Sequence, residues 1–135
     1  MRIFLDANIL FSAAKSDGAV RELVERLIDA RHECWVDGYV VDEARRNLVA
    51  KAPHGAAALE KLLPRLRLAD AHPASDTHTA APKLADKDRP VLAAAIRLGC
   101  EALVTGDRTH FGAFYGKKPG GVAIHSPRSL AELLL

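Results

Sequence analysis

The segment MRIFLDANILFSA, residues 1–13, sets the fold class of this chain. Residues 2–5 form a short, mostly apolar run of the kind that makes a buried strand, and Asp6 follows it directly. An ionised aspartate beside an apolar core is unfavourable unless a partner or a cation neutralises its charge. The segment therefore predicts a buried strand that leads into a carboxylate with a capping or a functional role.

Beyond this segment the chain alternates between strand-like and helix-like stretches. Short apolar runs predict strands at residues 33–36, 66–70, 101–105 and 121–126. Helical periodicity covers residues 18–31, 39–51, 55–66 (which Pro64 bends or stops) and 89–99, and a last helix begins after Ser126. Residues 71–85 lack periodicity and predict a loop.

The strands are aliphatic rather than alternating, which indicates a parallel sheet covered by helices on both faces. With 135 residues, 49% of them hydrophobic, the chain is long enough to bury one substantial core. No internal repeat or linker divides it. We therefore expect a single three-layer α/β/α domain over residues 1–135.

The composition excludes some functions and leaves others open. A formal net charge of +2 is compatible with a nucleic-acid partner but does not by itself argue for one, and 5% aromatic residues disfavour a base-stacking platform. Cys34 and Cys100 lack CxxC spacing and are expected to be free thiols. Because we find neither a signal peptide nor a long apolar run, we expect a cytoplasmic protein.

Two carboxylates directly follow predicted strands. Asp6 comes after residues 2–5, and Asp107 comes after the apolar run at residues 101–105. In open parallel sheets, ligands bind outside the carboxyl ends of the strands. These two acids are therefore expected at the same edge of the sheet.

Two further acids lie on helices that start from this edge. In the helix at residues 39–51, Glu43 lies at the border of the buried stripe, whereas Asp42 points outward. At the start of the helix at residues 89–99, Asp88 is in line with the packed face, whereas Asp86 has no defined direction. Glu43 and Asp88 are therefore the better candidates for a site.

Each acid also has a purely structural interpretation. Asp6, together with Asn8, or Asp88 could cap a helix. Asp107 could shape a turn, and Glu43 could be a solvated helix residue. Capping does not explain why four carboxylates meet at one sheet edge, where each raises the pKa of the others. A divalent cation removes this conflict, and a set of oxygen ligands suits Mg²⁺ or Mn²⁺.

A cation at such a site can activate water and stabilise a phosphate, which is typical of hydrolysis of phosphodiesters. Zinc spacing, a GxSxG motif, a Walker loop and a GxGxxG motif are all missing from the sequence. His110 lies close to Asp107 in the sequence and could assist, although a surface role is the favoured interpretation.

Four segments taken together resemble the PIN domain family. They are FLDANILFSA with Asp6, VVDEARRNL with Glu43, DRPVLAAAIRLG with Asp88 and ALVTGDRTHF with Asp107. The resemblance implies a Rossmann-like sandwich with a metal-dependent ribonuclease site, in which these four acids hold the Mg²⁺ or Mn²⁺ ion. It also implies similarity to the small bacterial VapC toxins, which are commonly dimeric and inhibited by an antitoxin protein.

Other polar residues near the acids have two interpretations. Asn8 and Thr105 are expected to orient a ligand acid or a metal-bound water, although Thr105 could equally be a strand residue with a satisfied hydroxyl. Lys87, Arg89 and Arg108 could contact RNA phosphates, although solvated positions are the simpler interpretation.

Two alternative functions compete with a nuclease. A receiver-type signalling domain needs an acidic pair after the first strand and a lysine after the last, and this chain has neither. A PIN fold kept as an RNA- or protein-binding module without catalysis is the stronger alternative. A phosphatase of the haloacid dehalogenase type needs DxD after the first strand, where this chain has DAN.

Overall fold

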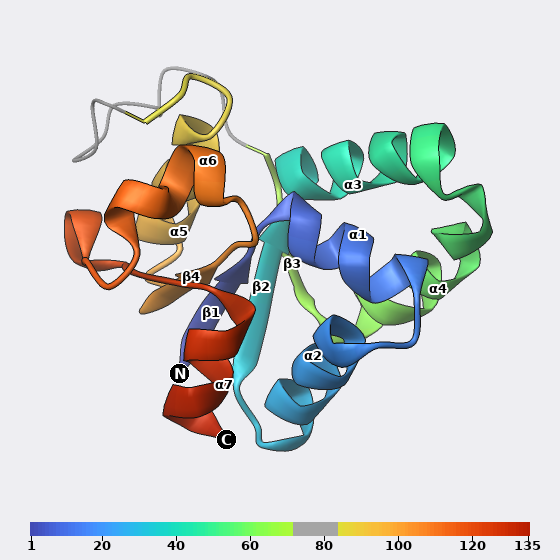
Figure 1. Cartoon of the computed structure of the whole chain (residues 1–135), viewed down its shortest axis with the longest axis horizontal. Coiled ribbons are helices and arrows are strands. Elements are labelled where there is room, and N and C mark those ends of the chain that lie inside the picture. The colour runs from blue at the N-terminus through green and yellow to red at the C-terminus, as the bar shows by residue number, and fades with distance from the viewer. Residues whose placement is uncertain (72–83) are drawn as a thin grey trace.

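A central parallel sheet forms the middle layer of the molecule (Figure 1). The structure is a computed structural model that describes residues 1–71 and 84–135. Five strands lie in the order β3-β2-β1-β4-β5, and each pairs with its neighbour in parallel. They are β1 (Arg2–Leu5), β2 (Glu33–Asp37), β3 (Arg67–Ala69), β4 (Ala102–Val104) and β5 (Ala123–His125). The expected α/β class with a parallel sheet is confirmed.

Helices form the outer two layers. They are α1 (Ala7–Lys15), α2 (Ala19–Asp29), α3 (Gly38–Lys51), α4 (Ala56–Leu62), α5 (Arg89–Arg97), α6 (Arg108–Phe111) and α7 (Pro127–Leu134). The steps from β1 to β2 and from β2 to β3 run in one direction, so right-handed crossovers place α1 to α4 on one face. The return to β4 places α5 on the other face. Figure 1 shows this separation, with α1, α3 and α4 on one side and α5 and α6 on the other.

The elements match the expected ones, with three local differences. The segment after Asp6 is a full helix, α1, whereas the sequence indicated only that Asp6 could cap a helix there. The expected helix at 55–66 is divided into α4 and a 3₁₀ turn, Leu63–Arg65, because Pro64 cannot donate the next helical hydrogen bond. The turn after β4 contains the short helix α6. Most of the expected loop at 71–85, namely residues 72–83, lies outside the described residues.

The core is aliphatic and centres on the two middle strands. Ile3, Phe4 and Leu5 of β1 are fully buried, and so are all three residues of β4. This burial on both faces explains why these strands lack alternation. Cys34 and Cys100 are buried free thiols, as expected. Among the described residues, we find no helix that is long and apolar enough to span a membrane.

The strand register brings separate parts of the chain to one edge. Leu5 pairs with Val104 across β1 and β4, so Asp6 and Thr105 leave the sheet side by side. The backbone N–H of Asp6 donates to the carbonyl oxygen of Val104 at 3.1 Å. In Figure 1 this carboxyl edge lies at the top, where α1 and α3 begin.

Candidate metal centre

Asp6 is held in place by the start of α1, of which it is the N-cap. Its Oδ1 accepts a hydrogen bond from the backbone N–H of Ala7 at 2.7 Å, and its Oδ2 accepts one from the Thr105 hydroxyl at 2.8 Å. Burial raises the pKa of Asp6 to about 6, although these two hydrogen bonds lower it, and the charges of Asp88 and Glu43 raise it further. The capping carboxylate therefore sits in an environment that disfavours its negative charge.

Asn8 and Thr105 tie the start of α1 to the segment after β4. The Asn8 amide donates to the Thr105 hydroxyl at 3.2 Å and, over 3.4 Å, to Asp6 Oδ2. Its Oδ1 accepts from the backbone N–H of Gly106 at 2.9 Å. The Thr105 oxygen also accepts from the backbone N–H of Asp107 at 3.1 Å. Both side chains are thus placed to orient Asp6 and Asp107, and their functional role stays a prediction.

Asp88 occupies the N-cap position of α5, but its carboxylate has no capping role. Among the described residues, its side chain makes no cap hydrogen bond, and Oδ2 is buried without a hydrogen-bond partner. Burial raises the pKa of Asp88; nearby His110 lowers it and Asp107 raises it. The structural interpretation of Asp88 as a simple cap therefore does not account for its carboxylate.

Asp107 and His110 face each other across the first turn of α6. Asp107 is the N-cap, and its Oδ1 accepts from the backbone N–H of His110 at 3.0 Å. Its Oδ2 lies 2.6 Å from His110 Nδ1. Although burial acts to raise the pKa of Asp107, the hydrogen bonds and the charge of His110 outweigh it and hold this pKa below its ordinary value. The buried Phe111 anchors this short helix in the core.

Glu43 comes from the middle of α3 and is half-buried, whereas its neighbour Asp42 is exposed. This is the orientation that the helical periodicity predicts. Tyr39, one turn earlier, donates from its hydroxyl to the backbone carbonyl of Lys87 at 2.6 Å. That bond ties α3 to the segment that carries Asp88, and so it brings these two acids to one place.

All four candidate acids line a single cavity of about 270 Å³. The complete lining is Asp6, Asn8, Glu43, Asn47, Lys51, Lys87, Asp88 and Asp107. Carboxylate oxygens are the preferred ligands of Mg²⁺ and Mn²⁺, and Asp88 contributes a buried oxygen that lacks a hydrogen bond within the described chain. The donor set therefore fits a divalent cation.

His110 lies closer to the acids than a surface role would predict. The ring lies between two acids, with Nδ1 3.2 Å from Asp88 Oδ2 as well as close to Asp107. The spacing Asp107-x-x-His110 carried a usable signal, because residues at the N-cap and at N3 of a helix face each other. Two cavity residues, Asn47 and Lys51, were also missed, and helical spacing from Glu43 would have suggested Asn47.

The cationic residues near the acids divide into two kinds. Lys87 is exposed and lines the cavity, so it is available to a phosphate. Arg89 instead donates from Nε to the carbonyl of Leu84 at 3.1 Å and pairs with Asp86 at 3.1 Å. The favoured interpretation, that these cations have no site role, therefore fits Arg89 better than Lys87.

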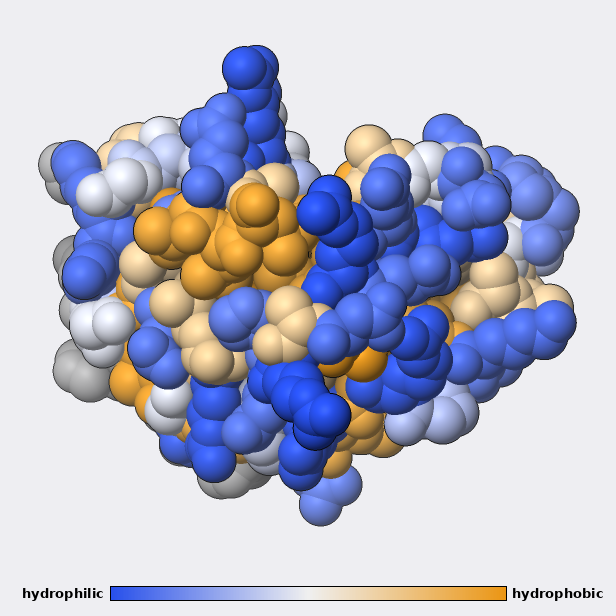
Figure 2. Space-filling model, turned by 90° about the horizontal axis from the view of Figure 1, so that it is seen from below, coloured by the Kyte–Doolittle hydropathy of each residue, from blue (hydrophilic) through white to orange (hydrophobic). Residues whose placement is uncertain are grey.

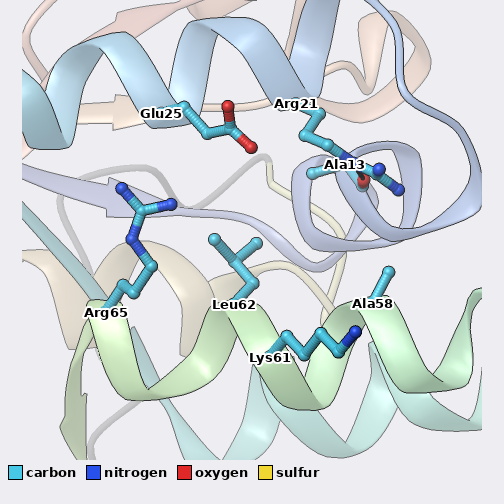
Figure 3. A pocket seen from close by; sticks show the side chains of 7 residues that line it. All are labelled: Ala13, Arg21, Glu25, Ala58, Lys61, Leu62 and Arg65. Atoms are coloured by element: carbon cyan, nitrogen blue, oxygen red, sulfur yellow. Dashed lines mark hydrogen bonds between the residues drawn. The ribbon is translucent and has the colours of Figure 1, made fainter.

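Two other cavities have different linings. One, of about 180 Å³, separates α2 from α4, and Figure 3 shows Glu25 and Arg65 reaching into it from opposite sides. Arg21 on its wall donates to the carbonyls of Ala13 and Ala14 at 2.6 and 3.2 Å. The other, of about 460 Å³, lies beside β5 and α7. Neither cavity brings several carboxylates together.

Figure 2 shows apolar side chains gathered on the face where α7 and both chain ends lie.

Several solved structures have a fold similar to that of this chain. PAE2754 from Pyrobaculum aerophilum has a TM-score of 0.70 and 23% identity, over 99% of this chain and 89% of its own. VapBC2 from Rickettsia felis, in a crystal structure with a DNA fragment from its promoter, has a TM-score of 0.68 and 16% identity, over 93% and 98% of the two chains. VapC20 from Mycobacterium tuberculosis, described as a toxin that cleaves the sarcin–ricin loop, has a TM-score of 0.63 and 13% identity, over 87% and 98%.

At these identities the solved structures establish the shared fold alone. No curated protein matches the sequence of this chain. The family model of the PIN domain matches residues 2–109, a range that includes all four candidate acids. This chain therefore belongs to the PIN domain family.

Proposed function

We propose that this protein is a Mg²⁺- or Mn²⁺-dependent endoribonuclease, with Asp6, Glu43, Asp88 and Asp107 as the residues that hold the cation. The observation that carries the proposal is their arrangement: four acids from separate segments line one small cavity. Burial raises the pKa values of Asp6 and Asp88, and the charges of neighbouring acids raise them further, so a bound cation would relieve a cost that both carboxylates bear. Membership of the PIN domain family supports nuclease chemistry.

When bound, a divalent cation lowers the pKa of a coordinated water and stabilises the charge that develops on a phosphate. The residues of the chain supply positioning. The Ala7 N–H and the Thr105 hydroxyl fix both oxygens of Asp6, and Asn8 holds the neighbouring backbone at Gly106. Lys51 and Lys87 at the cavity wall bring positive charge to the place where an RNA backbone must pass.

Cleavage of a mixed panel of single-stranded and structured RNAs tests the proposal. We would compare wild type with Asp88→Asn in Mn²⁺, in Mg²⁺ and in EDTA. Asp86→Asn is the matched control, because Asp86 lies two residues away on the same segment but is exposed and paired with Arg89. Glu43→Gln and Asp42→Asn form a second matched pair on α3.

We expect cleavage by wild type and by both control variants in either cation, and its loss in EDTA and in the two site variants. Cleavage that persists in EDTA would contradict a metal-dependent mechanism. If Mn²⁺ raises the melting temperature but no RNA is cleaved, the protein is a PIN-fold binding module without catalysis. A receiver-type domain would instead take up a phosphoryl group from a small phosphodonor, without cleaving RNA.

We further propose that the protein is the toxin of a toxin–antitoxin pair and that an antitoxin protein blocks the acidic cavity. The similarity of fold to VapBC2 and to VapC20, which is described as a toxin, supports this proposal. The description of VapC20 also supports RNA as the substrate class. Expression of wild type should arrest the growth of a bacterial host, whereas Asp88→Asn should not. Homodimer formation stays a prediction that light scattering in solution would test.

A further inference from the structure

The imidazole of His110 brings a nitrogen atom, in place of another carboxylate oxygen, close to two of the four candidate acids. Its Nδ1 lies 2.6 Å from Asp107 Oδ2 and 3.2 Å from Asp88 Oδ2. Ligand atoms of these three residues all lie within 4.8 Å of one another. The side chain of Asp88 is only 9% exposed and that of His110 is 32% exposed, so the group lies at the buried end of an accessible site.

The spacing of these atoms matches that of ligands around a first-row divalent cation. Ligand atoms about 2.1 Å from an octahedral ion lie about 3.0 Å apart when they are adjacent. The two distances from His110 Nδ1 bracket this value. Asp88 Oδ2 supplies an independent observation, because it is buried, aimed at this nitrogen and without a hydrogen bond in the part of the chain that the structure describes. A buried carboxylate oxygen in this state is unfavourable, and a bound cation would neutralise it.

We propose that His110 Nδ1 is a direct ligand of the cation, together with Asp88 and Asp107. The inference rests on the proposed function insofar as the acidic cavity holds a divalent ion. A nitrogen ligand changes which ion the site prefers, because Mg²⁺ binds almost only oxygen ligands, whereas Mn²⁺, although it also favours oxygen, binds imidazole more strongly than Mg²⁺ does. The site is therefore expected to select Mn²⁺ over Mg²⁺ more strongly than four carboxylates alone would.

Pulsed electron paramagnetic resonance of bound Mn²⁺ tests this directly, because a coordinated imidazole nitrogen couples to the electron spin. The full chain would be studied as wild type, His110→Asn and His54→Asn. Asparagine at position 110 can still donate a hydrogen bond to Asp107, so a merely positioning role of His110 would survive this change. His54 serves as the control, because it is an exposed histidine whose Nε2 lies 3.0 Å from the carbonyl oxygen of Lys15 and which is not part of the group of Asp88, Asp107 and His110.

We expect nitrogen coupling in wild type and His54→Asn and its loss in His110→Asn. Isothermal titration should also show the preference for Mn²⁺ over Mg²⁺ falling at least about tenfold in His110→Asn. Mn²⁺ that binds wild type without nitrogen coupling, with the same preference in His110→Asn, would overturn this inference and leave the proposed ribonuclease intact. Nitrogen coupling without RNA cleavage would support the inference and overturn the proposed ribonuclease. Absence of Mn²⁺ binding would overturn both.

Discussion

Asp37 and Asp88 are both buried aspartates at helix N-caps, yet the chain satisfies only one of them. Asp37, at the end of β2, accepts a hydrogen bond from the backbone N–H of Val40 at 3.1 Å, and its other oxygen lies 4.0 Å from the Arg97 guanidinium. Asp88, at the start of α5, has no such cap bond among the residues described. Its closest charged neighbours include another acid, Asp107.

Burial raises the pKa of both residues, so a raised pKa does not distinguish them. The two residues differ in how far neighbouring groups oppose the effect of burial on the pKa. The Val40 N–H and Arg97 oppose the effect of burial at Asp37. At Asp88 the charges of His110 and Lys87 oppose it, but the acids Asp107 and Glu43 add to it. A buried acid therefore indicates a functional site when the fold gives its carboxylate no cap bond and brings other acids close to it.

The largest expected difference between the two acids is in catalysis. Asp88→Asn should reduce metal-dependent RNA cleavage by about 1,000-fold, because a lost metal ligand removes several kcal/mol of transition-state stabilisation. Asp37→Asn should stay within about threefold of wild type, since asparagine also caps helices. Single-turnover rates at saturating Mn²⁺ measure both. An equal loss in the two variants would show that burial, not the cavity, determines the effect.

Asp6 resembles Asp37 in capping a helix and Asp88 in lining the acidic cavity. We expect the next largest effect here, in how the stability of the protein depends on pH. Its pKa is about 6 in the folded protein and about 3.9 in an unfolded chain, so folding takes up a proton between these values. The free energy of unfolding of the metal-free protein should therefore fall as the pH rises from about 4 to 6, with up to about 3 kcal/mol from Asp6.

Urea denaturation of wild type and Asp6→Asn in EDTA across this range measures that contribution. Asparagine does not titrate, so we expect the two proteins to be similar near pH 4 and Asp6→Asn to be the more stable one at pH 7. Wild type that stays the more stable at pH 7 would contradict the raised pKa of Asp6.

A smaller effect concerns helix capping and protein stability. Here we expect the substitution of Asp37 to have the larger effect, whereas in catalysis the substitution of Asp88 does. Asp37→Ala should lower the free energy of unfolding by about 1–2 kcal/mol, because α3 loses its cap and Arg97 loses its nearest acid. Asp88→Ala removes no cap bond and relieves repulsion, so the metal-free protein should change by about 0.5 kcal/mol or less. Chemical denaturation in EDTA provides the measurement, and a larger loss in Asp88→Ala would show that its carboxylate is structural after all.

The sequence predicts the sheet well because aliphatic strands buried on both faces leave a simple pattern. The runs at Arg2–Leu5 and Ala102–Val104 need no tertiary information to be recognised as strands. The helix α6 is different, since it has only four residues and depends on the Asp107 cap and on the buried Phe111. Periodicity cannot be read over four residues, so this helix appeared in the sequence as a turn.

At the site, the directions of single helix residues were predictable and the contacts between segments were not. Helical periodicity separates Glu43 from Asp42, and the structure places only Glu43 on the cavity. The contact between His110 and Asp88 joins α6 to the start of α5. Nothing in the sequence of either segment indicates that the two segments meet. Such pairings depend on how the elements pack, which explains why a surface role was favoured for His110.

The smallest expected effect concerns RNA binding and compares the acidic cavity with the cavity between α2 and α4. Lys51 and Lys87 line the first and Lys61 lines the second. In the inactive Asp88→Asn background, replacing Lys51 and Lys87 by alanine should weaken RNA binding a few-fold and reduce the salt dependence by about 0.7 per lost phosphate contact. Lys61→Ala should change neither. Equal effects from all three lysines would mean that RNA contacts the protein through diffuse positive charge, and that the acidic cavity does not define its path.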